Sequence, residues 1–149
     1  MADVEVTSLG VVHASASADA LDRLVVPGRA RACRVAEDEL LLLCARDDAG
    51  EIVREVRDRL GAGDADALVL DVTDGWAAVT LSGRDPRAAF AYLSALELPV
   101  DGFVQGEVVR LPAKVVVEAD RVHILVPSMV EVHLHDRLRR RLGHPGVRA

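Results

Sequence analysis

One β-β-α pattern occurs twice in this 149-residue chain and limits its fold more than any other feature. The segments 39–60 and 121–142 match without gaps, and each runs from an apolar strand to an arginine-rich helix end. A short turn with acidic residues precedes both segments, which indicates a hairpin. We predict an α+β fold with two β-β-α-like halves, whose strands share one mixed or antiparallel sheet with helices packed on it. The repeat fits either a duplication or two uses of a common supersecondary unit.

The length of the chain is that of one domain, and we expect residues 1–149 to form it. Such a domain can bury a sizeable core without disulfides or metals. In its first part we expect a strand at Val4–Leu9 and a short helix at Ala18–Leu24. Along the domain we expect three parts: an irregular N-terminal segment (1–30), the core (31–142) and a tail (143–149).

Charge and composition exclude two classes of partner. The formal net charge is −6, whereas proteins that bind nucleic-acid backbones need a basic face. The few aromatic residues are not enough for a base-stacking platform. The longest apolar run, Leu40–Ala45, is far shorter than the ~20 residues that span a bilayer. With no leader-like segment at the start, we expect a cytoplasmic protein without nucleic-acid or membrane partners.

The first half of the core is predicted as a hairpin followed by a helix. Its strands are Arg31–Ala36 and Glu39–Ala45, and the second is almost continuously apolar, which is typical of a strand buried on both faces. A helix is expected at Ala49–Leu60. Asp48 precedes it and Glu51 follows three residues later, which is the spacing of a capping box.

The middle of the chain contains two expected strands and one helix. Ala67–Val72 and Trp76–Ser82 have the apolar content of strands. Asp85 is a good N-cap and Pro86 fits the first helical position, so a helix begins there. We expect it to end at Leu98.

The last third is predicted as strands and a final helix. Glu107–Leu111, Ala113–Ala119 and Arg121–Val126 are the expected strands. Ser128 and Glu131 have the spacing of a second capping box. The buried stripe of this helix is expected at positions four residues apart: Val130, Leu134, Leu138 and Leu142.

The two cysteines, Cys33 and Cys44, do not form a Cys-x-x-Cys pair. In a hairpin that turns at Glu37–Asp38, Cys33 faces Leu42, so the two sulfur atoms lie diagonally and not opposite each other. We therefore expect two buried thiols in a reducing compartment and no disulfide.

Residues that carry chemistry do not converge in the sequence. His133 and His135 lie on an expected helix, which turns residues at this spacing about 200° apart and so disfavours a metal pair. His123 is expected as a lone residue on one face of a strand. Gly83 is expected in a tight turn, although a strand–glycine–helix order can also bind phosphate. We predict no catalytic, cofactor-binding or metal-binding residue.

Acidic residues cluster where one expected strand ends. Asp71 closes that strand, and Asp74 with the next glycine is typical of a turn. Turn capping is the preferred role, and a carboxylate that binds a substrate is the alternative.

The last helix and the residues after it are basic: Arg137, Arg139, Arg140, Arg141, His144 and Arg148. Such a run is usually a solvated face. Because the remaining chain is acidic, docking of an acidic partner surface is the alternative.

Residues 71–83, with the sequence DVTDGWAAVTLSG, lead into Ser82-Gly83-Arg84-Asp85 at a helix start. This pattern resembles the gamma subunit of heterotetrameric sarcosine oxidase, in the folate-binding aminomethyltransferase group that includes the glycine-cleavage T-protein. The resemblance covers most of 31–142 in diffuse motifs, including RVHILVPS at 121–128. Arg84 stands where the family often has proline, and the N-terminal portion is shorter.

The resemblance implies an aminomethyltransferase-like fold and a non-catalytic role in structure or assembly. The chain would be the gamma-type subunit of a heteromeric, flavin- and folate-dependent oxidase of N-methyl amines, a heterotetramer in the family. It would bind no cofactor alone. FAD, FMN, NAD and tetrahydrofolate would be held by the larger partners, an alpha-type subunit that binds folate and dinucleotide and a beta-type flavoprotein.

The sequence leaves two other functions open. One is a stand-alone folate-binding protein of the aminomethyltransferase type, in which Asp71 or Asp74 would contact the pterin. The other is a small interaction or sensor module, whose exposed sheet edge would pair in a homodimer.

Overall fold

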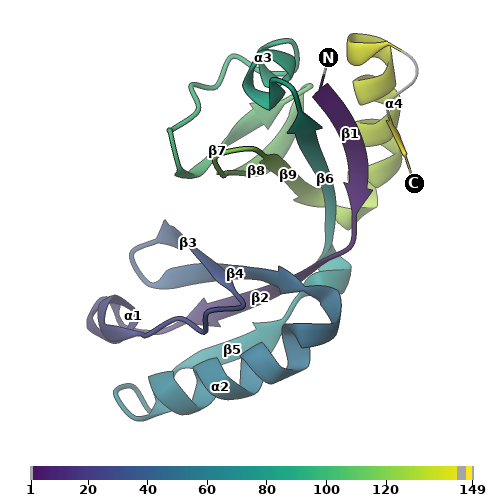
Figure 1. The fold of residues 1–149 in the computed structure, drawn as a ribbon. Helices are drawn as coiled ribbons and strands as arrows, with labels where there is room; N and C mark the ends of the chain where they lie inside the picture. Colours follow the sequence, from purple (N-terminus) through teal and green to yellow (C-terminus); the bar gives the residue numbers. More distant parts are fainter. Residues whose placement is uncertain (1, 144–146, 149) are drawn as a thin grey trace. The chain divides into compact units, whose positions relative to one another are not determined.

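The computed structural model describes residues 2–143 and 147–148. They divide into two compact units, Ser8–Thr73 and residues 2–7 with the described residues from Asp74 onwards. Each unit has its own sheet, helices and hydrophobic core (Figure 1). The α+β class with helices packed on antiparallel strands is confirmed. The prediction of one shared sheet is wrong, and the expected core at 31–142 is divided between the two units.

The unit Ser8–Thr73 contains a four-stranded antiparallel sheet in the order β3-β4-β2-β5. Both of its helices contribute apolar side chains to one core with one face of this sheet. The longer helix packs against β2 and β5. The elements are β2 (Leu9–Ser15), α1 (Ala18–Arg23), β3 (Arg31–Ala36), β4 (Glu39–Ala45), α2 (Ala49–Gly61) and β5 (Leu68–Asp71).

The second unit contains a sheet in the order β10-β1-β6-β9-β8-β7, in which only the β1–β10 pair is parallel. Two helices cover one face and bury Phe90, Leu134 and Leu138 against it. The elements are β1 (Ala2–Thr7), β6 (Trp76–Gly83), α3 (Pro86–Ala91), β7 (Gly102–Val108), β8 (Leu111–Val117), β9 (Val122–Pro127), α4 (Glu131–Leu142) and β10 (Val147–Arg148).

The N-terminal segment explains why there are two sheets. Residues 1–30 were expected to be irregular, but they supply one strand to each sheet, and the strand predicted at Val4–Leu9 is divided at Ser8. β1 pairs with β6, whereas β2 lies between β4 and β5. The strands of the two repeat halves lie in different sheets: β4 pairs with β2 and β3, whereas β9 pairs with β6 and β8.

The helix starts differ from the predicted capping boxes. Asp85 caps α3 as expected, accepting a hydrogen bond from the N–H of Ala88 at 3.0 Å. Asp48 and Ser128 do not cap their helices, because each belongs to a 3₁₀ turn, Arg46–Asp48 or Ser128–Val130, that leads into the helix. Asp48 has helical backbone angles (φ −88°, ψ −12°), whereas a capping residue is typically extended.

The hairpin between β7 and β8 was not predicted. A strand was expected at Glu107–Leu111, but Val109 and Arg110 form a two-residue turn with φ of 44° and 64°. Such turns usually contain asparagine or glycine, so the sequence carries no signal for this one. α3 is also shorter than expected, since the chain leaves the helix after Ala91.

Among the described helices, none combines the length and apolar character that crossing a membrane requires.

Candidate functional site

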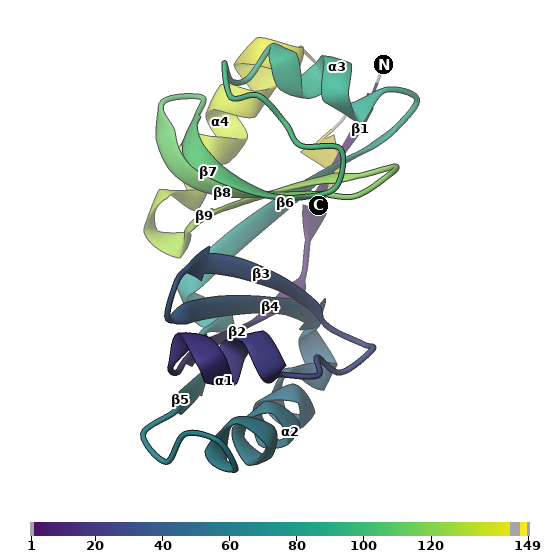
Figure 2. The same cartoon turned by 90° about the vertical axis from the view of Figure 1, so that its left-hand side faces the viewer.

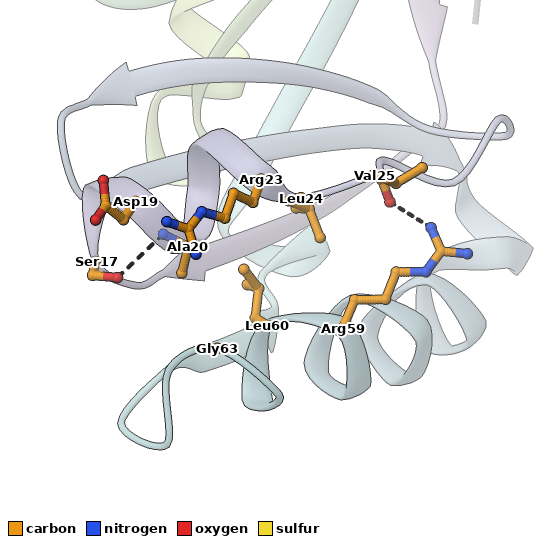
Figure 3. Close-up of a pocket in the computed structure, with 9 residues that line it drawn as sticks. All are labelled: Ser17, Asp19, Ala20, Arg23, Leu24, Val25, Arg59, Leu60 and Gly63. Carbon is orange, nitrogen blue, oxygen red and sulfur yellow. Dashed lines mark hydrogen bonds between the residues drawn. The ribbon is translucent and has the colours of Figure 1, made fainter.

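A pocket of about 660 Å³ lies in the unit Ser8–Thr73, between α1 and the C-terminal end of α2 (Figure 3). Ser17 caps α1 by accepting a hydrogen bond from the N–H of Ala20 at 3.2 Å. Leu60, which is fully buried, and Leu24 supply apolar surface. The pocket therefore has an apolar side and the polar start of a short helix.

Two arginines and one aspartate give this pocket its charge (Figure 3). The guanidinium of Arg59 donates to the carbonyl of Val25 and lies 3.5 Å from Glu55. Arg23 forms no hydrogen bond or ion pair within the described ranges. Asp19 lies near Ser17, at the opposite end from Arg59. Arginine does not lose its proton in proteins, so these groups support binding of a small polar molecule more than proton transfer.

A chain of polar side chains runs through the sheet of the second unit. Thr80 Oγ1 lies 2.5 Å from Thr7 Oγ1 and 2.8 Å from Nδ1 of His123, whose Nε2 lies 3.2 Å from Glu118. Because a carboxylate only accepts, Nε2 donates to Glu118 and Nδ1 accepts from Thr80 in the neutral histidine. The prediction of a lone His123 is wrong. Strand pairing places it opposite Thr80, which the sequence alone does not show.

The order hydroxyl, imidazole, carboxylate is also that of an activated nucleophile. Thr80 is only 5% exposed and His123 7%, and the hydroxyl of Thr80 is engaged on both sides. These hydrogen bonds therefore give partners to polar side chains that the fold buries, since buried polar groups are costly when they are unpaired.

The acidic cluster after β5 forms a turn. Asp71 Oδ1 accepts hydrogen bonds from the N–H of Thr73 at 3.0 Å and from its hydroxyl at 2.6 Å. These bonds hold the pKa of Asp71 below its ordinary value of 3.8. Thr73 Oγ1 also accepts from the N–H of Val11 at 3.0 Å, so the turn is fastened to β2. The turn-capping role predicted for Asp71 is confirmed, and Asp74 is exposed in the same turn.

His133 and His135 lie on α4, as predicted. The nearest charged partner of His135 is Glu131, 3.9 Å away. No cluster of three histidine, cysteine or acidic side chains that could hold a metal occurs among the described residues. His144 lies outside those residues.

Both thiols are buried and free, as predicted. Cys33 lies opposite Leu41, one position from the expected Leu42, because a β-bulge between Arg34 and Ala36 shifts the register. Cys44 lies opposite Gly10 of β2. Burial raises the pKa of the Cys44 thiol, and the charges of nearby aspartates raise it further.

The basic face of α4 is only partly free. Nη1 of Arg137 donates to the carbonyl oxygens of Val109 and Arg110 at 2.9 and 3.2 Å, so this arginine supports the β7–β8 turn. Arg140 lies 3.1 Å from Asp136, one helical turn earlier. Arg139 and Arg141 are exposed.

No family model matches the chain, and no curated protein matches its sequence. Solved structures do match. A chain of the heterotetrameric sarcosine oxidase from Corynebacterium sp. U-96, in complex with pyrrole 2-carboxylate, has a TM-score of 0.67 at 14% identity, over 94% of this chain and 84% of that one. Glycine cleavage system aminomethyltransferase T from Bartonella henselae has a TM-score of 0.68 at 18% identity, and the match covers 99% of this chain and 47% of that one. The ligand-free regulatory subunit of aspartate kinase from Thermus thermophilus has a TM-score of 0.53 at 11% identity, and the match covers 93% of this chain and 96% of that one.

These likenesses show an aminomethyltransferase-like fold. The chain spans about half the length of the aminomethyltransferase but most of the matched sarcosine oxidase chain. The resemblance expected from residues 71–85 is therefore supported as a relation of fold.

Proposed function

We propose that this chain is a non-catalytic, gamma-type subunit of a heteromeric sarcosine oxidase-like enzyme that oxidises N-methyl amines. The observation that carries the proposal is the mutual coverage with a chain of heterotetrameric sarcosine oxidase, 94% of this chain and 84% of the other. The aminomethyltransferase is matched over less than half of its length. The match thus spans most of the oxidase chain and less than half of the transferase.

The motif that carries the resemblance supports a role in structure. The side chains of Asp71 and Thr73 form hydrogen bonds within the turn, and Thr73 also binds the backbone of Val11. These hydrogen bonds give the Asp71 carboxylate a role in stabilising the turn. In the proposed complex, FAD, FMN, NAD and tetrahydrofolate belong to an alpha-type and a beta-type partner subunit, and this chain serves their assembly.

Purification of the native complex tests the proposal. The tagged chain is purified from its source cell under native conditions, and the partners are identified by mass. We expect two larger oxidase subunits, flavin absorbance and oxidation of an N-methyl amine in the complex, with none of these in the isolated chain. A chain that elutes without partners, or that oxidises an amine by itself, would refute the proposal.

A tetrahydrofolate-binding protein is the second candidate, because the match to the aminomethyltransferase covers 99% of this chain. Calorimetric titration of the isolated chain with tetrahydrofolate separates the two. The subunit proposal expects no heat of binding. Saturable heat that Asp71→Asn or Asp74→Asn abolishes would favour the folate-binding protein.

A further inference from the structure

A groove of about 560 Å³ opens between the C-terminal end of α3, the β7–β8 turn and the last turn of α4. Figure 2 shows α3 and α4 at the same end of their unit. The basic run of α4, for which docking of an acidic partner was the alternative role, supplies Arg141 to this groove, and the proposed function does not use the groove. Its side chains include Tyr92, Leu96, Glu107, Val109, Arg110 and Arg141.

The turn that forms one wall of the groove has a strained backbone. Val109 and Arg110 both have positive φ, which is an outlier for a β-branched residue. Three bonds hold the turn: the N–H of Val109 donates to the carbonyl of Leu93 at 2.8 Å, and Arg137 donates to both turn carbonyls. The backbone that carries Arg110 is therefore fixed in place before any ligand arrives.

The charge of the groove differs from that of the chain. Arg110 and Arg141 are exposed, and neither guanidinium has a hydrogen bond or ion pair with another described residue. Arg137 precedes Arg141 by one helical turn, so a third guanidinium lies on the same face of α4. Glu107 is the single acidic residue among the described lining residues. A local positive charge on a chain of net charge −6 favours binding of an acidic ligand at this place.

The groove also offers an apolar anchor. Tyr92 is 70% exposed and shares the groove with Leu96 and Val109. Tyrosine and arginine dominate the residues that contribute most to protein–protein binding. We propose that this groove binds an extended acidic segment of a partner protein, with its carboxylates on Arg110 and Arg141 and an apolar side chain against Tyr92. This goes beyond the subunit proposal, since it holds whichever protein carries the segment.

Binding of an acidic peptide to the full chain tests the inference. The probe is a fluorescein-labelled peptide with a glutamate pair on each side of a leucine, measured by anisotropy at low and physiological salt. We expect saturable binding that weakens as salt rises, because exposed charge pairs are screened. Amide shifts in a heteronuclear NMR titration should concentrate at Leu93–Leu96, Val109 and Arg110.

Variants distinguish the groove from general charge attraction. Arg110→Ala with Arg141→Ala should weaken binding about tenfold, since each exposed pair accounts for roughly a threefold change. Arg84→Ala with Arg121→Ala removes the same charge from exposed positions of the same unit and should leave the affinity unchanged. Tyr92→Ala should weaken binding at unchanged net charge. No saturable binding, or equal losses in the two double variants, would overturn the inference.

Discussion

Gly10 and Cys44 face each other across β2 and β4, and the sulfur of Cys44 fills the space that a side chain at position 10 would need. A Cβ atom on Gly10 would lie 2.8 Å from Cys44 Sγ and 2.9 Å from the carbonyl oxygen of Ala45. The thiol can rotate, but the carbonyl belongs to the β2–β4 ladder. The close approach of two strands therefore requires glycine at this position.

Gly10→Ala should destabilise the protein by about 1–3 kcal/mol, the usual cost of overpacking a core. Urea denaturation followed by circular dichroism measures the effect. Gly28→Ala is the matched control, because a Cβ there has nothing within 4 Å. The control should be neutral or slightly stabilising, since alanine restricts the unfolded chain. Equal midpoints for Gly10→Ala and the wild type would contradict the prediction.

Thr73→Val should cost about 1–3 kcal/mol although it keeps the shape of the side chain. The hydroxyl of Thr73 accepts from the N–H of Val11 and donates to Asp71, and Thr73 is buried. Valine leaves the N–H of Val11 without this partner, which costs the desolvation of that group. Chemical denaturation of the variant measures the loss. Thr73→Ser keeps the hydroxyl and should retain most of the wild-type stability. A Thr73→Ser variant as unstable as the Thr73→Val variant would refute the hydrogen-bond explanation.

Elements with strong local signals could be predicted from the sequence. The alternating and continuous apolar runs located β3, β4, β5, β6 and β9 to within two residues. The pair Asp85–Pro86 located the start of α3, since both its cap and its proline act locally. The apolar spacing of α4 correctly indicated that Leu134 and Leu138 are buried. These features depend on neighbours within one element.

The failures depend on contacts between elements. The capping box at Asp48 did not form: Asp48 lies in a 3₁₀ turn, and Glu51 accepts a hydrogen bond from Arg29 at 2.6 Å, a partner 22 residues away in the sequence. The turn at Val109–Arg110 has no turn-forming residue and is held from outside by Leu93 and Arg137. The division into two sheets follows from the pairing of β1 with β6 and of β2 with β4. No local sequence pattern specifies these partners. The hydrogen bonds of His123 could not be predicted either, because they depend on the register between β6 and β9.

Asp71→Asn should reduce stability at neutral pH and less at low pH. The folded-state pKa of Asp71 is lowered, so its carboxylate stabilises the fold above the ordinary value of 3.8, and this contribution is lost as pH falls toward the folded-state pKa. Asp71 is exposed, so solvent screening keeps the effect small. Urea midpoints at pH 6 and pH 3 for wild type and variant measure it. A difference that grows as the pH falls would have the wrong sign.

Both thiols should be unreactive in the native protein. Cys33 and Cys44 are buried, and burial raises the pKa of Cys44, whereas only the thiolate reacts with disulfide reagents. With Ellman's reagent at pH 8 we expect slow reaction of the folded chain and rapid release of two equivalents in guanidinium chloride. The Gly10→Ala variant, which displaces Cys44, should react faster. Rapid reaction of the native wild type would contradict the burial of the two thiols.

Arg110→Gly should stabilise the protein by about 0.5–1 kcal/mol while abolishing the arginine that the acidic peptide needs. A left-handed conformation costs an L-residue about 1–2 kcal/mol, and glycine removes this cost. Roughly half of the stabilisation is lost again, because glycine makes the unfolded chain more flexible. Arg110 has φ 64° and is exposed, and its carbonyl can still accept from Arg137. Arg84→Gly, an exposed position without positive φ, should be neutral or destabilising. Urea denaturation with peptide anisotropy on the same samples measures both effects, and an Arg110→Gly variant less stable than wild type would show that the turn is not strained.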